Sequence, residues 1–273
     1  MKQPFSIWSS FDIDLSPEDM VLAMEDRGLT VCELSDEHAA ELLKRPGDPY
    51  DTGKTFRDFA ASHGLSFPQG HLWLRVRLCD SNTDSVGILK NWLKLFAGIG
   101  IKNAVLHCDA KSFPEGTPIN EIYEANAQKL RPLAKTAEEL GIRICLENLS
   151  TTFQSAKSLL EVINRVNSPA LGICLDTGHL NISGVSSQKE FILNAGDRLH
   201  ALHIADNEGQ ADQHMMPFGR GTVDFADVMA GLKEIGYSDL FNYEIPGERN
   251  LPLPLRKAKA AYLQEVTEYL FSL

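Results

Sequence analysis

The sequence alternates short apolar runs rich in β-branched residues with longer stretches whose apolar residues recur at helical spacing. This alternation is typical of βα units around a parallel sheet, and it restricts the fold class more than any other feature of the chain. The predicted strands are Phe5–Ser9, Thr30–Leu34, Ser66–Trp73, Asn103–Cys108, Ile142–Glu147, Leu171–Asp176, Leu199–Ile204 and Phe241–Glu244. The predicted helices are Pro17–Arg27, Thr55–Ser62, Ser85–Ala97, Ile119–Leu140, Ala156–Val166, Gln188–Asn194, Phe225–Ile235 and Arg256–Leu270. The sequence therefore predicts an α/β protein.

Local signals mark the ends of two of these helices. Ser16 is a suitable N-cap for the first, with Pro17 at its first helical position, and Gly141 follows the apolar stripe of the fourth. Eight strands alternating with eight helices are what a (β/α)8 TIM barrel requires, and 273 residues suit a fold of typically about 250. No Gly/Ser-rich linker interrupts the alternation, so we expect residues 1–273 to form a single domain.

Composition restricts the expected cellular location of the protein and the kinds of partner that it can bind. No apolar run approaches the roughly 20 residues needed to cross a bilayer, and the N-terminus does not resemble a secretory signal, so we expect a cytoplasmic protein with no membrane partner. The five cysteines include no CxxC pair, which favours buried, inert thiols over disulfides or sulfur-ligated zinc. A net charge of −11 without a compensating basic cluster disfavours nucleic acid as a partner. Homo-oligomerisation is left open.

Most of the predicted strands end in or near a residue that can bind a metal ion. These residues are His71, His107, Glu147, Asp176, His203 and Glu244, with His179 shortly after Asp176. In a barrel, the carboxyl ends of the strands converge on one face. Because neighbouring members of this set lie about one βα unit apart, we expect their side chains to gather on that face.

Three of these residues are carboxylates at the ends of apolar strands. Glu147, Asp176 and Glu244 have no Lys or Arg adjacent in sequence, and burying an unpaired carboxylate is costly. A shared divalent cation would neutralise all three. The alternative is that each carboxylate finds its own arginine or backbone amide across the rim. The recurrence of three carboxylates and His203 at matching positions favours the cation.

The loop after the seventh predicted strand holds a further pair, Asp212 and His214, in a spacing that carboxylate and imidazole adopt around a divalent metal. Arg220 follows between two glycines, either in a tight turn or as a ligand for an anionic group of a substrate. Trp73 and Phe218 supply either the walls of a sugar site or plain core.

Four other residues have weaker signals. Glu33, near the end of the second predicted strand, either faces the pocket or supports a metal ligand from behind. His38, His63 and His200 end no strand in register with the others, so we interpret them as structural or surface groups.

The motifs in the C-terminal half resemble those of the xylose isomerase-like TIM-barrel superfamily. They are Ile144–Asn148, Cys174–His179, Leu202–Asn207 with Asp212–His214, and Tyr243-Glu244. This superfamily includes sugar isomerases and epimerases, such as the D-tagatose 3-epimerase, hydroxypyruvate isomerase and inosose dehydratase groups, and also endonuclease IV. The resemblance covers nearly the whole chain and is nearest in kind to the D-tagatose 3-epimerase and hydroxypyruvate isomerase groups.

The two branches imply different metal sites. The epimerase branch implies one metal, usually manganese, cobalt or zinc, held by Glu147, Asp176, His203 and Glu244, with the two glutamates as the acid/base pair and His179 on the substrate. The endonuclease branch implies three zinc ions that also involve His71, His107, His179, Asp212 and His214. Leu72–Arg77 departs from the DNA-wedging loop of that branch, and the acidic charge also disfavours it.

The sequence thus predicts a divalent-metal-dependent isomerase or epimerase of a small sugar or related hydroxy-carbonyl compound, acting by proton transfer through a metal-stabilised enediolate. No organic cofactor is expected. His71, His107, His179, Trp73 and Arg220 are the candidate substrate-binding residues. The main alternative is an endonuclease IV-like phosphodiesterase with a multi-zinc centre. A metal-retaining barrel that only binds a ligand is a third, weaker alternative.

Overall fold

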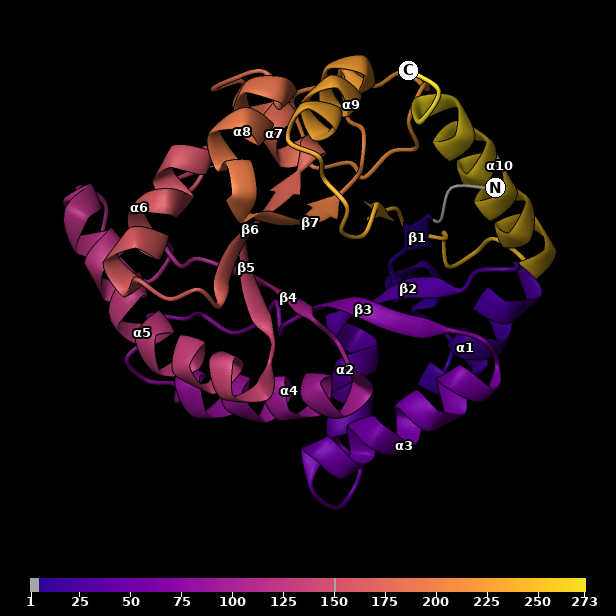
Figure 1. The fold of residues 1–273 in the computed structure, drawn as a ribbon, viewed down its shortest axis with the longest axis horizontal. Helices are drawn as coiled ribbons and strands as arrows, with labels where there is room; N and C mark the ends of the chain where they lie inside the picture. The colour runs from indigo at the N-terminus through magenta and orange to yellow at the C-terminus, as the bar shows by residue number, and fades with distance from the viewer. Residues whose placement is uncertain (1–4, 150) are drawn as a thin grey trace.

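A curled parallel sheet lies at the centre of the molecule, and helices surround its outer side (Figure 1). The structure is a computed structural model, and it describes residues 5–149 and 151–273. This arrangement agrees with the predicted α/β class. No helix in the described residues is both long and apolar enough to span a membrane.

The strands follow the order of the chain. Strands β2 to β7 form one parallel sheet in the order β2-β3-β4-β5-β6-β7, and β1 pairs with β8 in a second, two-stranded parallel sheet. Single bridges, Trp8–Glu33 and Ile204–Tyr243, link the second sheet to β2 and to the end of β7. The strands are β1 (Ser6–Ile7), β2 (Val31–Leu34), β3 (Ser66–His71), β4 (Asn103–His107), β5 (Arg143–Glu147), β6 (Leu171–Asp176), β7 (Leu199–His203) and β8 (Asn242–Tyr243).

Most of the α-helices begin after a residue whose side chain caps them, whereas α5 and α10 follow a proline without such a cap. Ser16 accepts a hydrogen bond from the Asp19 N–H at the start of α1, as predicted, and Gly141 ends α5 with a positive φ. The α-helices are α1 (Pro17–Asp26), α2 (Asp36–Leu43), α3 (Pro49–Ser62), α4 (Ser85–Ile99), α5 (Ile119–Leu140), α6 (Ala156–Val166), α7 (Thr177–Ser183), α8 (Gln188–Ala195), α9 (Phe225–Glu234) and α10 (Leu253–Leu270). Short 3-10 helices cover Ser9–Asp12 and Gly196–Arg198.

Two of these helices are absent from the sequence prediction. Both α2 and α7 start immediately after a strand, at the residue that follows Ser35 and Asp176 respectively, so these two residues act as N-caps. Helix α3 also begins earlier than predicted, at Pro49. Each of these segments is too short, or too polar at its start, for its apolar spacing to identify a helix.

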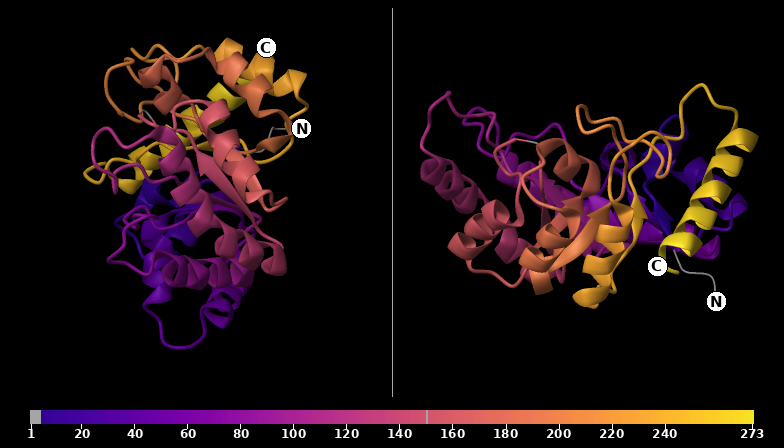
Figure 2. Two further views of the ribbon diagram at one scale, coloured as in Figure 1. Left: turned by 90° about the vertical axis from the view of Figure 1, so that its left-hand side faces the viewer. Right: turned by 90° about the horizontal axis from the view of Figure 1, so that it is seen from above.

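The sheet places the strand ends on one side of the molecule. In the right-hand view of Figure 2, the long loops after β4, β7 and β8 rise on one side, and the C-terminus lies on the other. The apolar core packs between the sheet and the helices, whereas Ser6, Glu33, Gln69, His203 and Asn242 are fully buried polar residues of the strands. The interior of the sheet is therefore polar close to the strand ends.

Candidate functional site

Four donor side chains meet at the carboxyl ends of the strands. Glu147 ends β5, Asp176 ends β6, His203 ends β7, and Glu244 directly follows β8. The strand register makes His203 the neighbour of Asp176. Each of the four offers a ligand atom, and these atoms all lie within 4.8 Å of one another. The structure thus brings together the four residues predicted to hold one divalent cation.

The chemistry of this donor set fits a cation. The four residues have exposed fractions between 0 and 5%. Within the described part of the chain, Asp176 Oδ2, His203 Nδ1 and Glu244 Oε2 are buried without a hydrogen-bond partner. A buried polar atom without a partner costs roughly 1–3 kcal/mol. One divalent cation would give all three atoms a partner and would balance the carboxylate charge.

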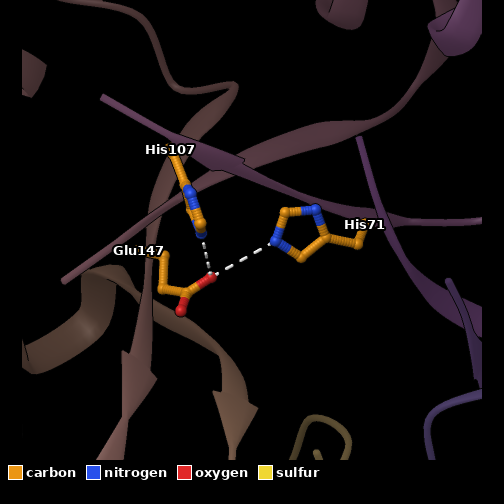
Figure 3. Close-up of side chains that lie close together, drawn as sticks. All are labelled: His71, His107 and Glu147. Carbon is orange, nitrogen blue, oxygen red and sulfur yellow. Dashed lines mark hydrogen bonds and ion pairs between the residues drawn. The ribbon is translucent and has the colours of Figure 1, made fainter. Parts of the chain in front are cut away.

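Glu147 also belongs to a second donor group, with His71 from β3 and His107 from β4 (Figure 3). Nε2 of His71 and Nε2 of His107 lie 3.4 and 3.0 Å from Oε2 of Glu147. Nδ1 of His71 lies 2.6 Å from the carbonyl oxygen of Leu72, which accepts its proton and leaves Nε2 directed at the carboxylate. The group offers a second set of cation ligands, with Glu147 shared between the two sets.

A third cluster joins α7 to the loop after β7. Nε2 of His179 lies 3.3 Å from Oδ2 of Asp212, and Nε2 of His214 lies 3.2 Å from Oδ1 of the same carboxylate. Nδ1 of His179 lies 3.2 Å from Oε1 of Glu147, so this cluster is continuous with the first. All nine residues considered as metal ligands from the sequence therefore gather on one face.

Burial and charge act in opposite directions on the carboxyl groups. Burial raises the pKa of Asp176 to about 7. Burial also acts to raise the pKa of Glu244, but the positive charges of His203 and His214 outweigh it and lower that pKa to about 2. The pKa of Glu147 is lowered in the same way, against burial, by His203 and His107. Both glutamates are therefore ionised at neutral pH, as proton acceptors and cation ligands must be.

The histidines show the reciprocal effect. Burial acts to lower the pKa of His71 and of His214, but Glu147 raises the first to about 9, and Asp212 with Glu244 raises the second to about 10. The pKa of His179 rises to about 12, against burial, because Asp176, Asp212 and Glu147 surround it. A cation competes with protons for such nitrogens, so cation binding here releases protons.

Two of the candidate substrate-binding residues, Trp73 and Arg220, lie in other surroundings, and so does Phe218. Trp73 stacks on Trp92 of α4, with ring centroids 6.0 Å apart. The Arg220 side chain is 73% exposed, and Nη2 lies 3.5 Å from Oε2 of Glu208. Phe218 is half exposed and packs on Phe225 and Tyr269. These are the contacts seen in residues 5–149 and 151–273, so roles toward a substrate stay predictions for Trp73, Arg220 and Phe218.

Two residues near the donors have a larger part in the structure than the sequence suggested. Cys174, interpreted as inert, offers its sulfur to a donor group with Glu147 and His203, although burial raises the pKa of its thiol well above the usual value. Trp8 stacks on His214, with ring centroids 6.3 Å apart. Both could have been found from the sequence, because Trp8 lies near the end of a predicted strand and Cys174 lies two residues before Asp176 on one strand face.

Comparison with known families gives one match that covers most of the chain. A family model described as "Xylose isomerase-like TIM barrel" matches residues 21–270. A crystal structure of a D-tagatose 3-epimerase-like protein superposes with a TM-score of 0.78 over 97% of each chain, at 20% sequence identity. At that identity, the superposition speaks for the fold alone.

Curated relatives align over shorter stretches. The chain is 32% identical over 147 residues to L-ribulose 3-epimerase of Methylomonas sp., covering 51% of this chain and 48% of the relative. It is 30% identical over 134 residues to inosose isomerase of Bacillus subtilis, covering 46% and 48%. The chain thus spans about half the length of these relatives. Neither relative is named as a nuclease, so the comparisons do not favour the phosphodiesterase alternative.

Proposed function

We propose, from the premise that this chain belongs to the xylose isomerase-like TIM-barrel family, that it is a divalent-metal-dependent isomerase or epimerase. Its substrate is a small sugar or a related hydroxy-carbonyl compound. The relatives named as an L-ribulose 3-epimerase and an inosose isomerase support this substrate class. The architecture that we propose with it is a single-domain, eight-stranded barrel, for which the bridges from β1 to β2 and from β7 to β8 are the support.

The observation that carries the proposal is the set of buried donor atoms without partners at the strand ends. Glu147, Asp176, His203 and Glu244 would hold the cation, and manganese, zinc and cobalt all suit these oxygen and nitrogen donors. When bound, the cation supplies electrostatic stabilisation for the negative charge that develops on a carbonyl oxygen of the substrate. His71, His107 and Glu147 would offer a place for a further ion or for substrate hydroxyls.

In this proposal, Glu147 and Glu244 carry out the proton transfer. Strand β5, which ends in Glu147, and strand β8, which precedes Glu244, lie on opposite sides of β6 and β7. Their carboxylates therefore approach a bound substrate from different sides. One can remove a proton from the carbon next to the carbonyl, and the other can return a proton to the opposite face. His179, which is mostly buried beside Glu147, would orient the substrate by hydrogen bonds.

Deuterium exchange tests the proposal directly. In deuterium oxide, with a panel of ketoses, ketose phosphates and hydroxypyruvate, we expect the protein to introduce deuterium into one substrate at a carbon next to the carbonyl. Exchange should stop with chelator and in Glu244→Gln, but should persist in His63→Ala, because His63 pairs with Glu25 on the surface. Exchange that needs no metal, or that is unchanged in Glu244→Gln, would contradict the mechanism.

A further inference from the structure

Glu33 is a buried carboxylate directly behind the donor set. It is 0% exposed, and its Oε1 lies 3.0 Å from Nε2 of His203, which is also 0% exposed. Across the described chain, the ion-pair partner of Glu33 is this histidine rather than a Lys or Arg. Placing a carboxylate in such surroundings costs several kcal/mol unless its partners need its charge or both of its oxygens.

Both oxygens of Glu33 are in use. Oε2 accepts a hydrogen bond from Nδ2 of Asn242, and Oδ1 of Asn242 accepts one from the Ser6 hydroxyl at 2.7 Å. A continuous chain of hydrogen bonds therefore runs Ser6, Asn242, Glu33, His203, through β1, β8, β2 and β7. These four strands flank the two places where the two-stranded sheet meets the six-stranded sheet.

The same chain fixes the roles of the two nitrogens of His203. Because Glu33 accepts at Nε2, the single proton of the neutral ring lies on that nitrogen. Nδ1, on the opposite side of the ring, lies 3.3 Å from Oε2 of Glu147 and 3.2 Å from Oε2 of Glu244 and makes no hydrogen bond to them. Nδ1 therefore faces the two other donors, where a bound cation would take the place of the Nδ1 proton of the charged ring.

We propose that Glu33 is a positioning residue for the metal site: by accepting a hydrogen bond from Nε2–H of His203, it holds the ring proton on Nε2 and leaves Nδ1 to the cation. It touches neither cation nor substrate. The inference deepens the proposed function, since it rests on a cation binding at the four donors. A carboxylate behind a ligating histidine also raises the basicity of the ring, and removal of such a partner typically weakens metal binding by roughly 10- to 100-fold.

The hydrogen-bond pattern explains why an amide at position 33 could not replace the carboxylate of Glu33. His203 and Asn242 both present N–H groups to Glu33, so position 33 must accept twice. The glutamine amide has one group that accepts, its oxygen, and one group that donates, its NH2. In Glu33→Gln, the side-chain oxygen would go to Asn242, and the amide N–H would face Nε2 of His203. That nitrogen would then have to accept, which places the ring proton on Nδ1, where it blocks the cation.

The test uses the full chain with zinc alone and no sugar. We expect zinc affinity, measured by competition with a chromophoric chelator, to fall about 10- to 100-fold in Glu33→Gln. In the zinc-loaded wild-type protein, nitrogen–proton NMR of the histidine side chains should find the His203 proton on Nε2. An unchanged zinc affinity in folded Glu33→Gln, or a proton on Nδ1 in the wild type, would overturn the proposal.

A double variant separates the hydrogen-bond pattern from simple packing. In Glu33→Gln/Asn242→Asp, the introduced glutamine amide can donate to the new carboxylate and accept from His203, while the Ser6 hydroxyl keeps its acceptor. This double variant retains both the net charge and the chain of hydrogen bonds, so it carries the test even where Glu33→Gln alone fails to fold. We expect it to recover most of the lost zinc affinity. A folded double variant that binds zinc as weakly as Glu33→Gln, or that carries the proton on Nδ1, would overturn the proposal.

The matched control lies on the same strand. His200, at the opposite end of β7, has an Asp239 carboxylate 2.9 Å from its Nδ1. Asp239→Asn should leave zinc affinity unchanged, because His200 is not a ligand. A failure of the isomerase proposal would appear as absent deuterium exchange with zinc affinities as expected. A failure of the Glu33 proposal would leave exchange intact, with a zinc affinity that is either unchanged in Glu33→Gln or not recovered in the double variant.

Discussion

One carboxylate, that of Glu147, lies within ion-pair distance of four imidazole rings. They belong to His71, His107, His179 and His203. This carboxylate belongs to all three donor groups found among the described residues, so a change in its charge affects each of them. A substitution of Glu147 therefore tests the proposed cation site as a whole.

Glu147→Gln keeps the shape of the side chain but removes its charge. We expect it to lose bound cation, with an affinity decrease larger than the roughly 100-fold that loss of a supporting residue can cause. Circular dichroism should stay native, because β5 is held by backbone pairing to β4 and β6. The measurement is metal content per chain after dialysis. Glu25→Gln, which alters a Glu–His pair on the surface, should retain full metal content, and equal metal retention in Glu147→Gln would refute the assignment.

For single residues, the sequence predicts the position of a side chain best where the backbone alone determines that position. Glu147, Asp176 and His203 could be identified because a strand end fixes where a side chain lies in a parallel sheet. Trp73 and Arg220 lie after strands, in loops, where side-chain direction depends on tertiary contacts that no spacing reveals. Glu33 had the correct position in sequence, but only the structure shows that its second oxygen is occupied by Asn242.

Among the elements, helix α7 has an N-cap residue that is also a candidate cation ligand. Asp176 is a candidate ligand through Oδ2, and its Oδ1 accepts a hydrogen bond from the His179 N–H as the N-cap of α7. Both roles use one side chain, so one substitution can alter both. The effect on capping and the effect on cation binding each depend on which group replaces the carboxylate.

Two substitutions at Asp176 should separate these roles. Asn is as good an N-cap as Asp, so Asp176→Asn should change the unfolding free energy by less than about 0.5 kcal/mol, whereas Asp176→Ala should lower it by about 1 kcal/mol. Both should lose tight cation binding. Urea unfolding with chelator present measures the first effect, and metal content measures the second. Equal unfolding free energies for the Asn and Ala variants would argue against the capping role.

Helices α3 and α4 approach each other unusually closely at two glycines. A Cβ on Gly98 would lie 2.1 Å from the Tyr50 carbonyl oxygen, and one on Gly53 would lie 2.3 Å from that of Leu95. These contacts involve backbone atoms, which cannot move aside without separating the helices.

Gly98→Ala sets helix propensity against this clash. Alanine gains about 1 kcal/mol over glycine inside a helix, but forced overpacking costs typically 1–3 kcal/mol. With a 2.1 Å approach to backbone, we expect the clash to prevail and the unfolding free energy to fall by about 1–2 kcal/mol. Gly219→Ala is the control, since its Cβ would meet nothing closer than 3.7 Å. A more stable Gly98→Ala protein would show that the helices can move apart.

The predicted elements agree with the structure where they are long and periodic. The bounds of α5 and α6 match the prediction, because each has an apolar stripe over several turns and a residue of positive φ at its end. Helices α2 and α7 have eight and seven residues, too few for periodicity to show. Their signal in the sequence is the cap residue, Ser35 or Asp176, and an N-cap alone does not predict a helix.

Across the whole molecule, a cluster of charges that is buried except at Asp14 joins the two ends of the chain. Asp12 pairs with Arg27 of α1 and with Arg256 of α10, and Arg256 also pairs with Asp14. Arg256 is almost completely buried, so these carboxylates are its necessary partners. The cluster fixes the C-terminal helix against the segment that follows β1.

Because of this cluster, we expect the free energy of unfolding to depend on pH in the acid range. The Arg256 hydrogen bond lowers the pKa of Asp14, so the ionised group contributes stability above its unfolded pKa of about 3.9 and loses it as the pH falls through the lower folded value. We expect the wild type to be more stable than Asp14→Asn at pH 7. The difference should shrink between about pH 5 and about pH 3. Urea unfolding at several pH values measures it, and a constant difference would contradict the linkage.

For the molecule as a whole, the alternation of strands and helices predicts the order and direction of all the strands. The division into two sheets could not be predicted, because β1 and β8 each keep only two residues in regular pairing. Polar side chains inside the sheet, Ser6, Glu33 and Asn242, lie close to these short strands. Their hydrogen bonds form only when the two ends of the chain meet, which local patterns do not encode.

The hydrogen-bonded chain from Ser6 to His203 has a consequence for the order in which the protein matures. Its links span 236, 209 and 170 residues, and Asn242 and Glu244 emerge late in synthesis. Contacts so distant along the chain form last, since the intervening loop must close first. An unfinished polypeptide therefore has neither the complete donor set nor the support behind it. We therefore expect a fragment that ends before β8 to lack the proposed cation site.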